Sequence, residues 1–247
     1  WMLKINKNGG IGLFKCDNEE IIRENNEPIF TYRSFCNADY KYWLTHYSRN
    51  LQETAVWALG DFARPGMNRV EGKYPVGRFP YQVEKICGTD SQITVNLTCD
   101  EKLCDKLGAP RLIQVIYTLT VEGLNVDVSW FGKDANRLTE TIYMHIFPAY
   151  DIQFKKLGCL VNPQEVTNNG SRNLHAVQCV ELGNYDIINH HSPLVSVGKG
   201  KILEFDNKFE DVKTDGLSFV LYNNVWGTNF PLWYEDNARF IFEIKKK

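Results

Sequence analysis

The chain has 247 residues, of which 43% are hydrophobic, 23% charged and 13% aromatic. A chain of this length and composition can bury a large core, which excludes an intrinsically disordered protein. Its 28 Lys and Arg residues oppose 30 Asp and Glu residues, so a chain-wide basic field for nucleic acid is absent. No apolar run approaches the ~20 residues of a membrane-spanning helix. We therefore expect neither nucleic acid nor a membrane as a partner.

Apolar and aromatic runs predict β-strands along most of the chain. The strongest signal is a pair of runs, 112–121 and 124–130, in which apolar and polar residues alternate on either side of Glu122-Gly123. This pattern predicts a β-hairpin with its turn at Glu122-Gly123. Its first strand should bury Ile113, Val115, Tyr117, Leu119 and Val121. The other predicted strands are 11–16, 29–35, 139–147, 174–182, 185–189, 217–222 and 238–244.

One segment has helical rather than strand periodicity. Asp39 can cap a helix. The apolar positions of that helix are Tyr40, Trp43, Leu44 and Tyr47. A further helical turn or two is expected within 51–57. The Pro- and Gly-rich stretch 61–81 predicts a long ordered loop.

These elements predict an all-β protein with one or two short helices. No internal repeat, low-complexity tract or linker divides the chain, so we expect one domain over residues 1–247. An immunoglobulin-type sandwich of ~100 residues would leave over half of the chain unused, which favours a large antiparallel β-supersandwich of two layers. Because the chain opens on Trp1 without a signal segment, we expect the C-terminal fragment of a longer protein.

Local motifs for metal, phosphate or nucleophilic chemistry are absent from the sequence. His190 and His191 are adjacent, so in a strand they point to opposite faces and cannot hold one ion together. The seven cysteines include no C-x-x-C pair. We therefore expect reduced thiols, with Cys99 and Cys104 as the pair most able to form a disulfide, and no zinc or other cofactor in this chain.

Two polar clusters are the candidate sites. Segment 221–234 combines amides and aromatic rings, which can bond sugar hydroxyls and pack on a sugar ring. The candidate carbohydrate-binding residues are Asn224, Trp226, Asn229, Trp233 and Tyr234. The alternative is a structured loop in which Gly227 takes a positive φ and at least one tryptophan anchors on the core.

The second cluster follows a predicted strand. Its candidate residues are Lys133, Arg137 and Glu140. They would either line a cleft or form a buried ion-pair brace, and the brace is favoured.

Three stretches together resemble a poorly characterised family similar to glycoside hydrolase family 38, the α-mannosidases. They are 46–62, containing His-Tyr-Ser-Arg-Asn-Leu-Gln-Glu-Thr and Trp-Ala-Leu-Gly-Asp-Phe, 132–140, Gly-Lys-Asp-Ala-Asn-Arg-Leu-Thr-Glu, and 222–234, Tyr-Asn-Asn-Val-Trp-Gly-Thr-Asn-Phe-Pro-Leu-Trp-Tyr. The resemblance covers nearly the whole chain, although Thr139 stands where the family pattern has proline. It implies a galactose-mutarotase-like supersandwich that supports a separate catalytic domain. That missing domain would hold the zinc and the carboxylate nucleophile, so no catalytic residue carries over to this chain.

Three alternative functions are consistent with these residues and with the resemblance. The leading one is a carbohydrate-associated C-terminal β-domain of a glycoside hydrolase, whose partners are carbohydrate or the catalytic domain of the same polypeptide. The second is a free-standing sugar epimerase or polysaccharide lyase. Its base would be sought among His145, His175 and Glu140. The third is a structural or interaction domain without a ligand.

Overall fold

The computed structural model describes residues 1–47, 50, 51, 53, 56–61, 63–163, 174–204, 216–227 and 232–247. The elements are, in chain order, β1 (Met2–Ile5), β2 (Ile11–Cys16), β3 (Glu19–Ile22), β4 (Phe30–Ser34), α1 (Asn37–Tyr47), α2 (Ala58–Asp61), η1 (Met67–Arg69), β5 (Gly77–Pro80), β6 (Gln82–Gly88), β7 (Gln92–Thr98), α3 (Glu101–Leu107), β8 (Leu112–Leu119), β9 (Gly123–Phe131), β10 (Glu140–Ile146), β11 (Gln153–Lys156), β12 (Cys159–Val161), β13 (Leu174–Ala176), β14 (Cys179–Leu182), β15 (Tyr185–Asn189), β16 (Leu194–Val197), β17 (Leu217–Asn223) and β18 (Ala238–Lys246).

A nine-stranded antiparallel sheet forms one layer of the molecule, in the order β12-β11-β14-β15-β18-β9-β8-β7-β6. The predicted hairpin, β8 and β9, lies beside the central strand β18, and within it Val115 pairs with Val128. Strand β18 extends it by pairing Phe242 with Val126. Alternate side chains of β8 are fully buried, as expected for a sheet with one face on the core.

A six-stranded sheet forms the second layer, in the order β13-β16-β17-β10-β4-β5. Strand β10 lies between β17 and β4, and all seven of its residues are buried. This strand is therefore covered on both faces, unlike β8.

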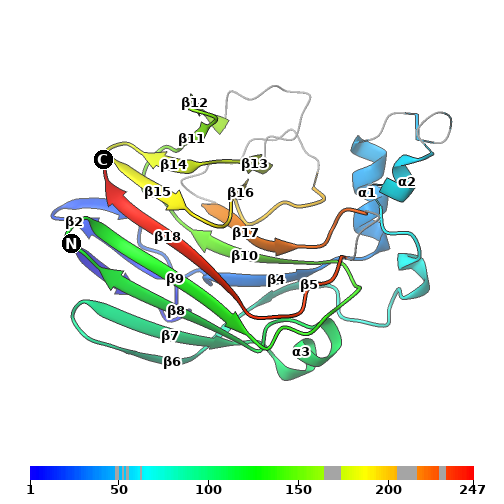
Figure 1. Cartoon of the computed structure of the whole chain (residues 1–247), viewed down its shortest axis with the longest axis horizontal. Helices are drawn as coiled ribbons and strands as arrows, with labels where there is room; N and C mark the ends of the chain where they lie inside the picture. Colours follow the sequence, from blue (N-terminus) through cyan, green and yellow to red (C-terminus); the bar gives the residue numbers. More distant parts are fainter. Residues whose placement is uncertain are drawn as a thin grey trace.

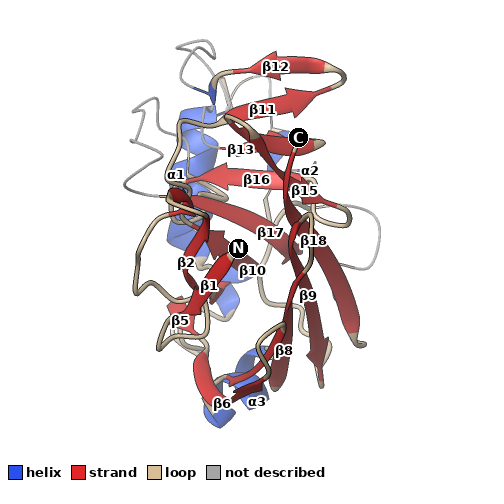
Figure 2. Ribbon diagram, turned by 90° about the vertical axis from the view of Figure 1, so that its left-hand side faces the viewer, coloured by secondary structure: helices blue, strands red, loops and turns tan. Residues whose placement is uncertain are grey.

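The inner faces of the two sheets meet in a core of aromatic and branched side chains. The ring centroids of Phe219 on β17 and Phe242 on β18 are 5.1 Å apart, and those of Trp130 and Tyr222 are 6.5 Å apart. Figures 1 and 2 show the two layers facing each other, with α1 and α2 at one end of the sandwich. Figure 1 places both chain termini at the other end. Each large apolar side chain buried between the layers contributes ~1.5–3 kcal/mol.

A small three-stranded sheet, β1-β2-β3, lies near the chain's beginning. Trp1 stacks on Phe14 of this sheet with centroids 5.3 Å apart, and its ring also meets that of Tyr185 on β15 edge-on, with centroids 6.2 Å apart, which ties the small sheet to the nine-stranded one. A single β-bridge between Ile22 and Pro148 joins the small sheet to the segment that follows β10.

The antiparallel all-β prediction with few helices is confirmed. The predicted hairpin forms, but its turn was placed wrongly: Thr120 N–H donates to Gly123 O at 2.8 Å, so Val121 and Glu122 occupy the turn. Val121 is consequently 95% exposed rather than on the buried face.

The predicted helix forms as α1 but begins before Asp39. The Asp39 carboxylate, in the first turn, accepts a hydrogen bond from the Cys36 N–H at 2.7 Å, which is the reciprocal half of a capping box. The predicted buried face is confirmed for Tyr40, Trp43 and Leu44, whereas Tyr47 is 50% exposed.

Two other boundaries differ from the predictions. The run 174–182 is two strands, β13 and β14, which pair with different sheets. The expected loop 61–81 contains η1 and β5, and β5 is the edge strand of the six-stranded sheet, where a proline is tolerated.

The sequence interpretation missed several short elements. Helix α3 is capped by Asp100, which accepts from Lys102 N–H at 2.9 Å, and it ends at Gly108 with φ 66°. The strands that periodicity did not predict are β1, β3, β5, β6, β7, β11, β12 and β16.

Within the described residues, no helix is both long enough and apolar enough to cross a membrane. All seven cysteines are free. The thiols of Cys99 and Cys104 contact each other, and this contact together with burial raises the pKa of the Cys99 thiol.

Candidate functional site

Strand β10 carries polar side chains on both faces of the six-stranded sheet, among them Glu140 on the inner face and His145 on the outer face. Glu140 and His145 are five residues apart in one strand, so they point to opposite faces of the sheet. Glu140 bonds Tyr32 and His145 bonds Thr31, which are adjacent residues of β4. The two groups therefore belong to two separate sites.

The inner site is a buried ion pair. Lys133 Nζ lies 2.8 Å from Glu140 Oε1, and both side chains are 0% exposed. The ammonium also donates to Gly108 O at 3.1 Å and lies 5.0 Å from the Tyr222 ring centroid. Tyr32 lies 2.5 Å from Glu140 Oε2. Burial raises the pKa of Glu140, and the attraction of Lys133 offsets this only in part.

Arg137 does not join this pair. Its guanidinium lies 4.6 Å from the ring centroid of Trp233, which is 41% exposed. The three residues of the predicted cluster therefore do not lie together. Lys133 and Glu140 form the buried ion pair that the sequence favours, and Arg137 lies over an exposed indole.

The candidate residues of the C-terminal segment also divide. Asn224 is buried, its Oδ1 accepts from Glu140 N–H at 2.7 Å, and its Nδ2 donates to Leu138 O at 2.8 Å. Trp226 packs partly buried against the core, whereas Tyr234 is 36% exposed. Asn229 lies outside the described residues. Sugar binding by this segment stays a prediction.

The sequence predicts a positive φ at Gly227, whereas the structure shows that this glycine permits close packing of the backbone. It is not among the glycines with positive φ. A Cβ at this position would instead lie 2.4 Å from Ala63 O and 2.7 Å from Gly60 O. The glycine thus permits close approach of the α2 end to the segment that holds Asn224 and Trp226.

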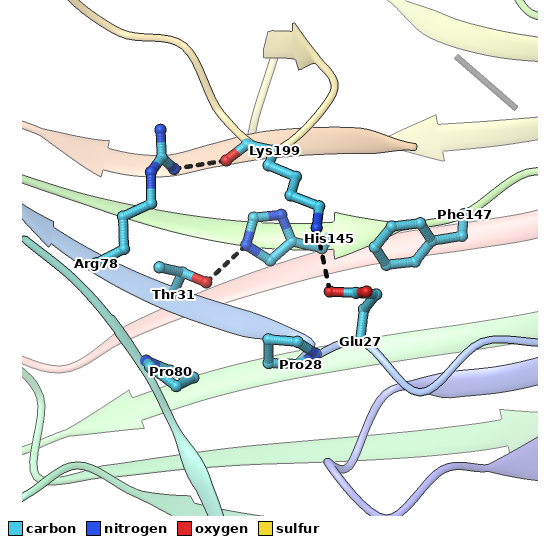
Figure 3. Close-up of a pocket in the computed structure, with 8 residues that line it drawn as sticks. All are labelled: Glu27, Pro28, Thr31, Arg78, Pro80, His145, Phe147 and Lys199. Carbon is cyan, nitrogen blue, oxygen red and sulfur yellow. Dashed lines mark hydrogen bonds and ion pairs between the residues drawn. The ribbon is translucent and has the colours of Figure 1, made fainter. Parts of the chain in front are cut away.

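A cavity of about 180 Å³ lies on the other face of the six-stranded sheet, above His145. Figure 3 shows its lining side chains. They are Glu27, Pro28, Thr31, Arg78, Pro80, His145, Phe147 and Lys199. Strands β4, β5 and β10, the segments beside them and the segment after β16 thus meet at one site.

The charged groups around this cavity are paired. Lys199 Nζ lies 3.6 Å from Glu27 Oε2. Arg78 donates to the backbone oxygen of Lys199 at 2.6 Å and lies 3.2 Å from Glu204 Oε1. The lining therefore holds two cations and one carboxylate, and the second carboxylate, Glu204, pairs with Arg78 from outside the lining.

His145 occupies the cavity floor and is held at both ring nitrogens. Nδ1 lies 2.8 Å from Ser218 Oγ, and Nε2 lies 2.8 Å from Thr31 Oγ1. Burial lowers the pKa of His145 to about 3, and the positive charges of Arg78 and Lys199 act in the same direction. The ring is consequently neutral at physiological pH.

Of the three bases considered from the sequence, only His145 lines this cavity. His175 is buried, with its ring centroid 4.8 Å from that of Phe154. Sequence reasoning missed the remaining lining residues, because they come from separate segments that only the sheet order brings together. No three His, Cys, Asp or Glu side chains gather as a metal site in the part of the chain that the structure describes.

Solved structures align with this chain over nearly its whole length at low sequence identity. A galactose mutarotase-like protein from Lactobacillus casei aligns at TM-score 0.49 and 10% identity, over 97% of this chain and 94% of that one. A protein provisionally described as an aldose 1-epimerase, from Escherichia coli K12, aligns at TM-score 0.48 and 10% identity, over 98% and 93%. A galactose mutarotase-like protein from Clostridium acetobutylicum aligns at TM-score 0.43 and 8% identity, over 99% and 91%. At such identity the likeness is one of fold alone.

No protein-family model matches the sequence, and no curated protein matches it. The resemblance to a family related to glycoside hydrolase family 38 accordingly stays a prediction.

Replacing Asn224 tests whether its amide is structural. Asn224→Ala removes an acceptor and a donor that satisfy buried backbone groups, so we expect a loss of about 1–3 kcal/mol in the free energy of unfolding. Asn223→Ala is the matched control, because this neighbouring amide is only half-buried and should cost less. Urea unfolding measures both. Equal effects of the two substitutions would contradict the structural role of Asn224.

The depressed pKa of His145 predicts a pH-dependent stability. Between about pH 3 and 6.5 the unfolded chain binds a proton at His145 that the folded chain does not, so the free energy of unfolding falls as pH falls. At about 1.4 kcal/mol per pH unit, this group alone should remove about 2 kcal/mol by pH 5. His145→Gln should lack that contribution, and His190→Gln, at an exposed site, should retain it. Parallel profiles for His145→Gln and the wild type in urea unfolding would refute the prediction.

Proposed function

We propose that the cavity above His145 binds one neutral sugar ring, and that the chain is a carbohydrate-binding β-sandwich domain. The observation that carries this proposal is a small cavity with apolar walls, a polar floor and charged groups that are each ion-paired. Each of these properties limits the class of ligand.

The volume limits the ligand to a small molecule. About 180 Å³ is smaller than the 300–1,000 Å³ of drug-sized sites. A single ring fits these dimensions better than an oligosaccharide or a nucleotide.

The lining favours a neutral polyhydroxylated ring. Pro28, Pro80 and Phe147 provide apolar and aromatic surface for the C–H face of such a ring. Glu27 and Thr31 provide polar atoms for its hydroxyl groups. Because the charges are paired within the protein, a charged ligand would gain little attraction and would lose hydration.

His145 is poorly suited to proton transfer at neutral pH. A general acid or base is most effective when its pKa lies near the working pH, and the pKa of His145 is about 3. This supports binding rather than catalysis. It agrees with the interpretation from the sequence that hydrolysis would need an α-mannosidase-like catalytic domain of the same polypeptide, which would supply zinc and the nucleophile.

Exposed aromatic residues at the α1–α2 end, Tyr47 and Trp57, provide apolar surface for such a partner domain.

One observation favours a second function, sugar epimerisation. The carboxyl group of Glu27 lines the cavity, and a carboxyl group can transfer the protons that ring opening and closure require, with neutral His145 as a hydrogen-bonding group rather than a base. Polarimetry with freshly dissolved α-D-glucose or α-D-galactose separates the two functions. An acceleration that Glu27→Ala abolishes would favour the epimerase.

We expect neutral monosaccharides to bind at this cavity. Isothermal titration with D-glucose, D-galactose and D-mannose should detect binding of at least one of them, and D-glucuronate and D-glucosamine should bind more weakly. Glu27→Ala removes a charged hydrogen-bonding group and should weaken binding about 10-fold or more. Glu122→Ala, at the exposed β8–β9 turn, is the control. Preferential binding of a charged sugar, or unchanged affinity in Glu27→Ala, would contradict the proposal.

A further inference from the structure

We infer that Thr31 recognises the ligand as a hydrogen-bond acceptor, so that the cavity selects a sugar with a free hydroxyl group directed at Thr31. The direction of this bond is set by a chain of hydrogen bonds that runs from Gly198 through Ser218 and His145 to Thr31. The inference rests on the proposed function, because it specifies the ligand of the same cavity.

The chain of bonds starts at a carbonyl group. Ser218 Oγ lies 2.6 Å from Gly198 O, and a carbonyl oxygen can only accept. A hydroxyl group has one proton, so the Ser218 proton must lie on this contact. Ser218 Oγ is then left with lone pairs toward His145 Nδ1, 2.8 Å away.

This arrangement fixes the tautomer of His145. Nδ1 must carry the ring proton, because it can bond Ser218 Oγ only as a donor. A neutral imidazole has one N–H, so Nε2 is an acceptor. The environment that disfavours the imidazolium supports a neutral ring: burial, with two cations nearby.

The tautomer in turn fixes the Thr31 hydroxyl. Its single proton must point to His145 Nε2, 2.8 Å away. What Thr31 can present to the cavity is therefore a pair of oxygen lone pairs. Figure 3 shows this hydroxyl directed at the imidazole on the cavity floor.

The origin of the chain is itself held in place. Gly198 N–H donates to Gly216 O at 2.8 Å, and Lys201 N–H donates to Ser196 Oγ at 2.8 Å. Arg78 donates to the backbone oxygens of Lys199 and Gly200, the two residues that follow Gly198. The Gly198 carbonyl is thus fixed relative to β17, and the whole chain of donors keeps one direction.

The chemical consequence is a requirement for a donor on the ligand. A sugar hydroxyl can donate to Thr31 Oγ1. A fluorine substituent can only accept, and a hydrogen substituent can do neither, so both should lose the interaction to a similar degree. If Thr31 were the donor, a fluorine would retain part of the interaction that a hydrogen loses.

The free protein provides the first test. Two-dimensional ¹⁵N NMR of the histidine side chains, with His145 assigned by comparison with His145→Gln, should show a protonated Nδ1 and an unprotonated Nε2. A protonated Nε2, or an imidazolium at pH 7, would overturn the inference without any ligand being involved.

The second test uses ligand analogues and the titration assay. The probes are D-glucose, D-galactose and D-mannose with their monodeoxy and monodeoxyfluoro derivatives. At one ring position, the deoxy and fluoro derivatives should both bind about 10-fold more weakly to the wild type. Thr31→Val should weaken binding of the parent sugar by a similar factor and abolish the difference in affinity between the parent and its derivatives. Thr31→Ser keeps the hydroxyl group and should restore that difference.

Thr141→Val is the matched control for this test. Thr141 is a fully buried threonine of β10 whose hydroxyl has no hydrogen-bond partner among the described residues, and it does not line the cavity. Its replacement should leave sugar affinity unchanged.

The outcomes separate the inference from the proposed function. Binding of a sugar that keeps its affinity when the critical hydroxyl is fluorinated, or in Thr31→Val, would overturn the inference and leave the function intact. Failure of all three sugars to bind the wild type would overturn the function and, with it, the role of Thr31 in recognition. The tautomer measurement would still report on the hydrogen-bond chain.

Discussion

Burial of strand β10 on both faces is the constraint on which both polar sites depend. Its side chains are almost entirely removed from water, so the polar groups on the strand must find partners within the protein or remain unsatisfied at a cost of about 1–3 kcal/mol each. On the inner face Glu140 is satisfied by Lys133 and Tyr32. On the outer face His145 is satisfied by Ser218 and Thr31.

The two faces satisfy this constraint with different consequences. The inner pair is closed off from solvent, and Asn224 ties the same region to the backbone of Glu140, so this side braces the sandwich. The outer face leaves a cavity beside the imidazole, with Phe147 on its wall and paired charges around it. Only this second arrangement leaves space for a ligand.

Sequence reasoning recovered features that are encoded by near neighbours. The alternation of Ile113, Val115 and Tyr117 predicts a buried strand face, and the odd spacing of Glu140 and His145 predicts opposite orientations. It could not locate the cavity, because Glu27, Arg78 and Lys199 are far apart in the chain and meet only through the strand order. Gly227 shows a related limit, since its requirement comes from the backbone of Gly60 and Ala63 rather than from its own turn.

A crystal structure of the protein soaked with the tightest-binding of D-glucose, D-galactose and D-mannose tests the central claim most directly. We predict one ordered sugar ring in the cavity above His145, with a ring hydroxyl within hydrogen-bond distance of Thr31 Oγ1 and its apolar face toward Phe147. An ordered sugar at Trp233 and Arg137 with an empty His145 cavity would contradict the account and return the carbohydrate site to the C-terminal segment.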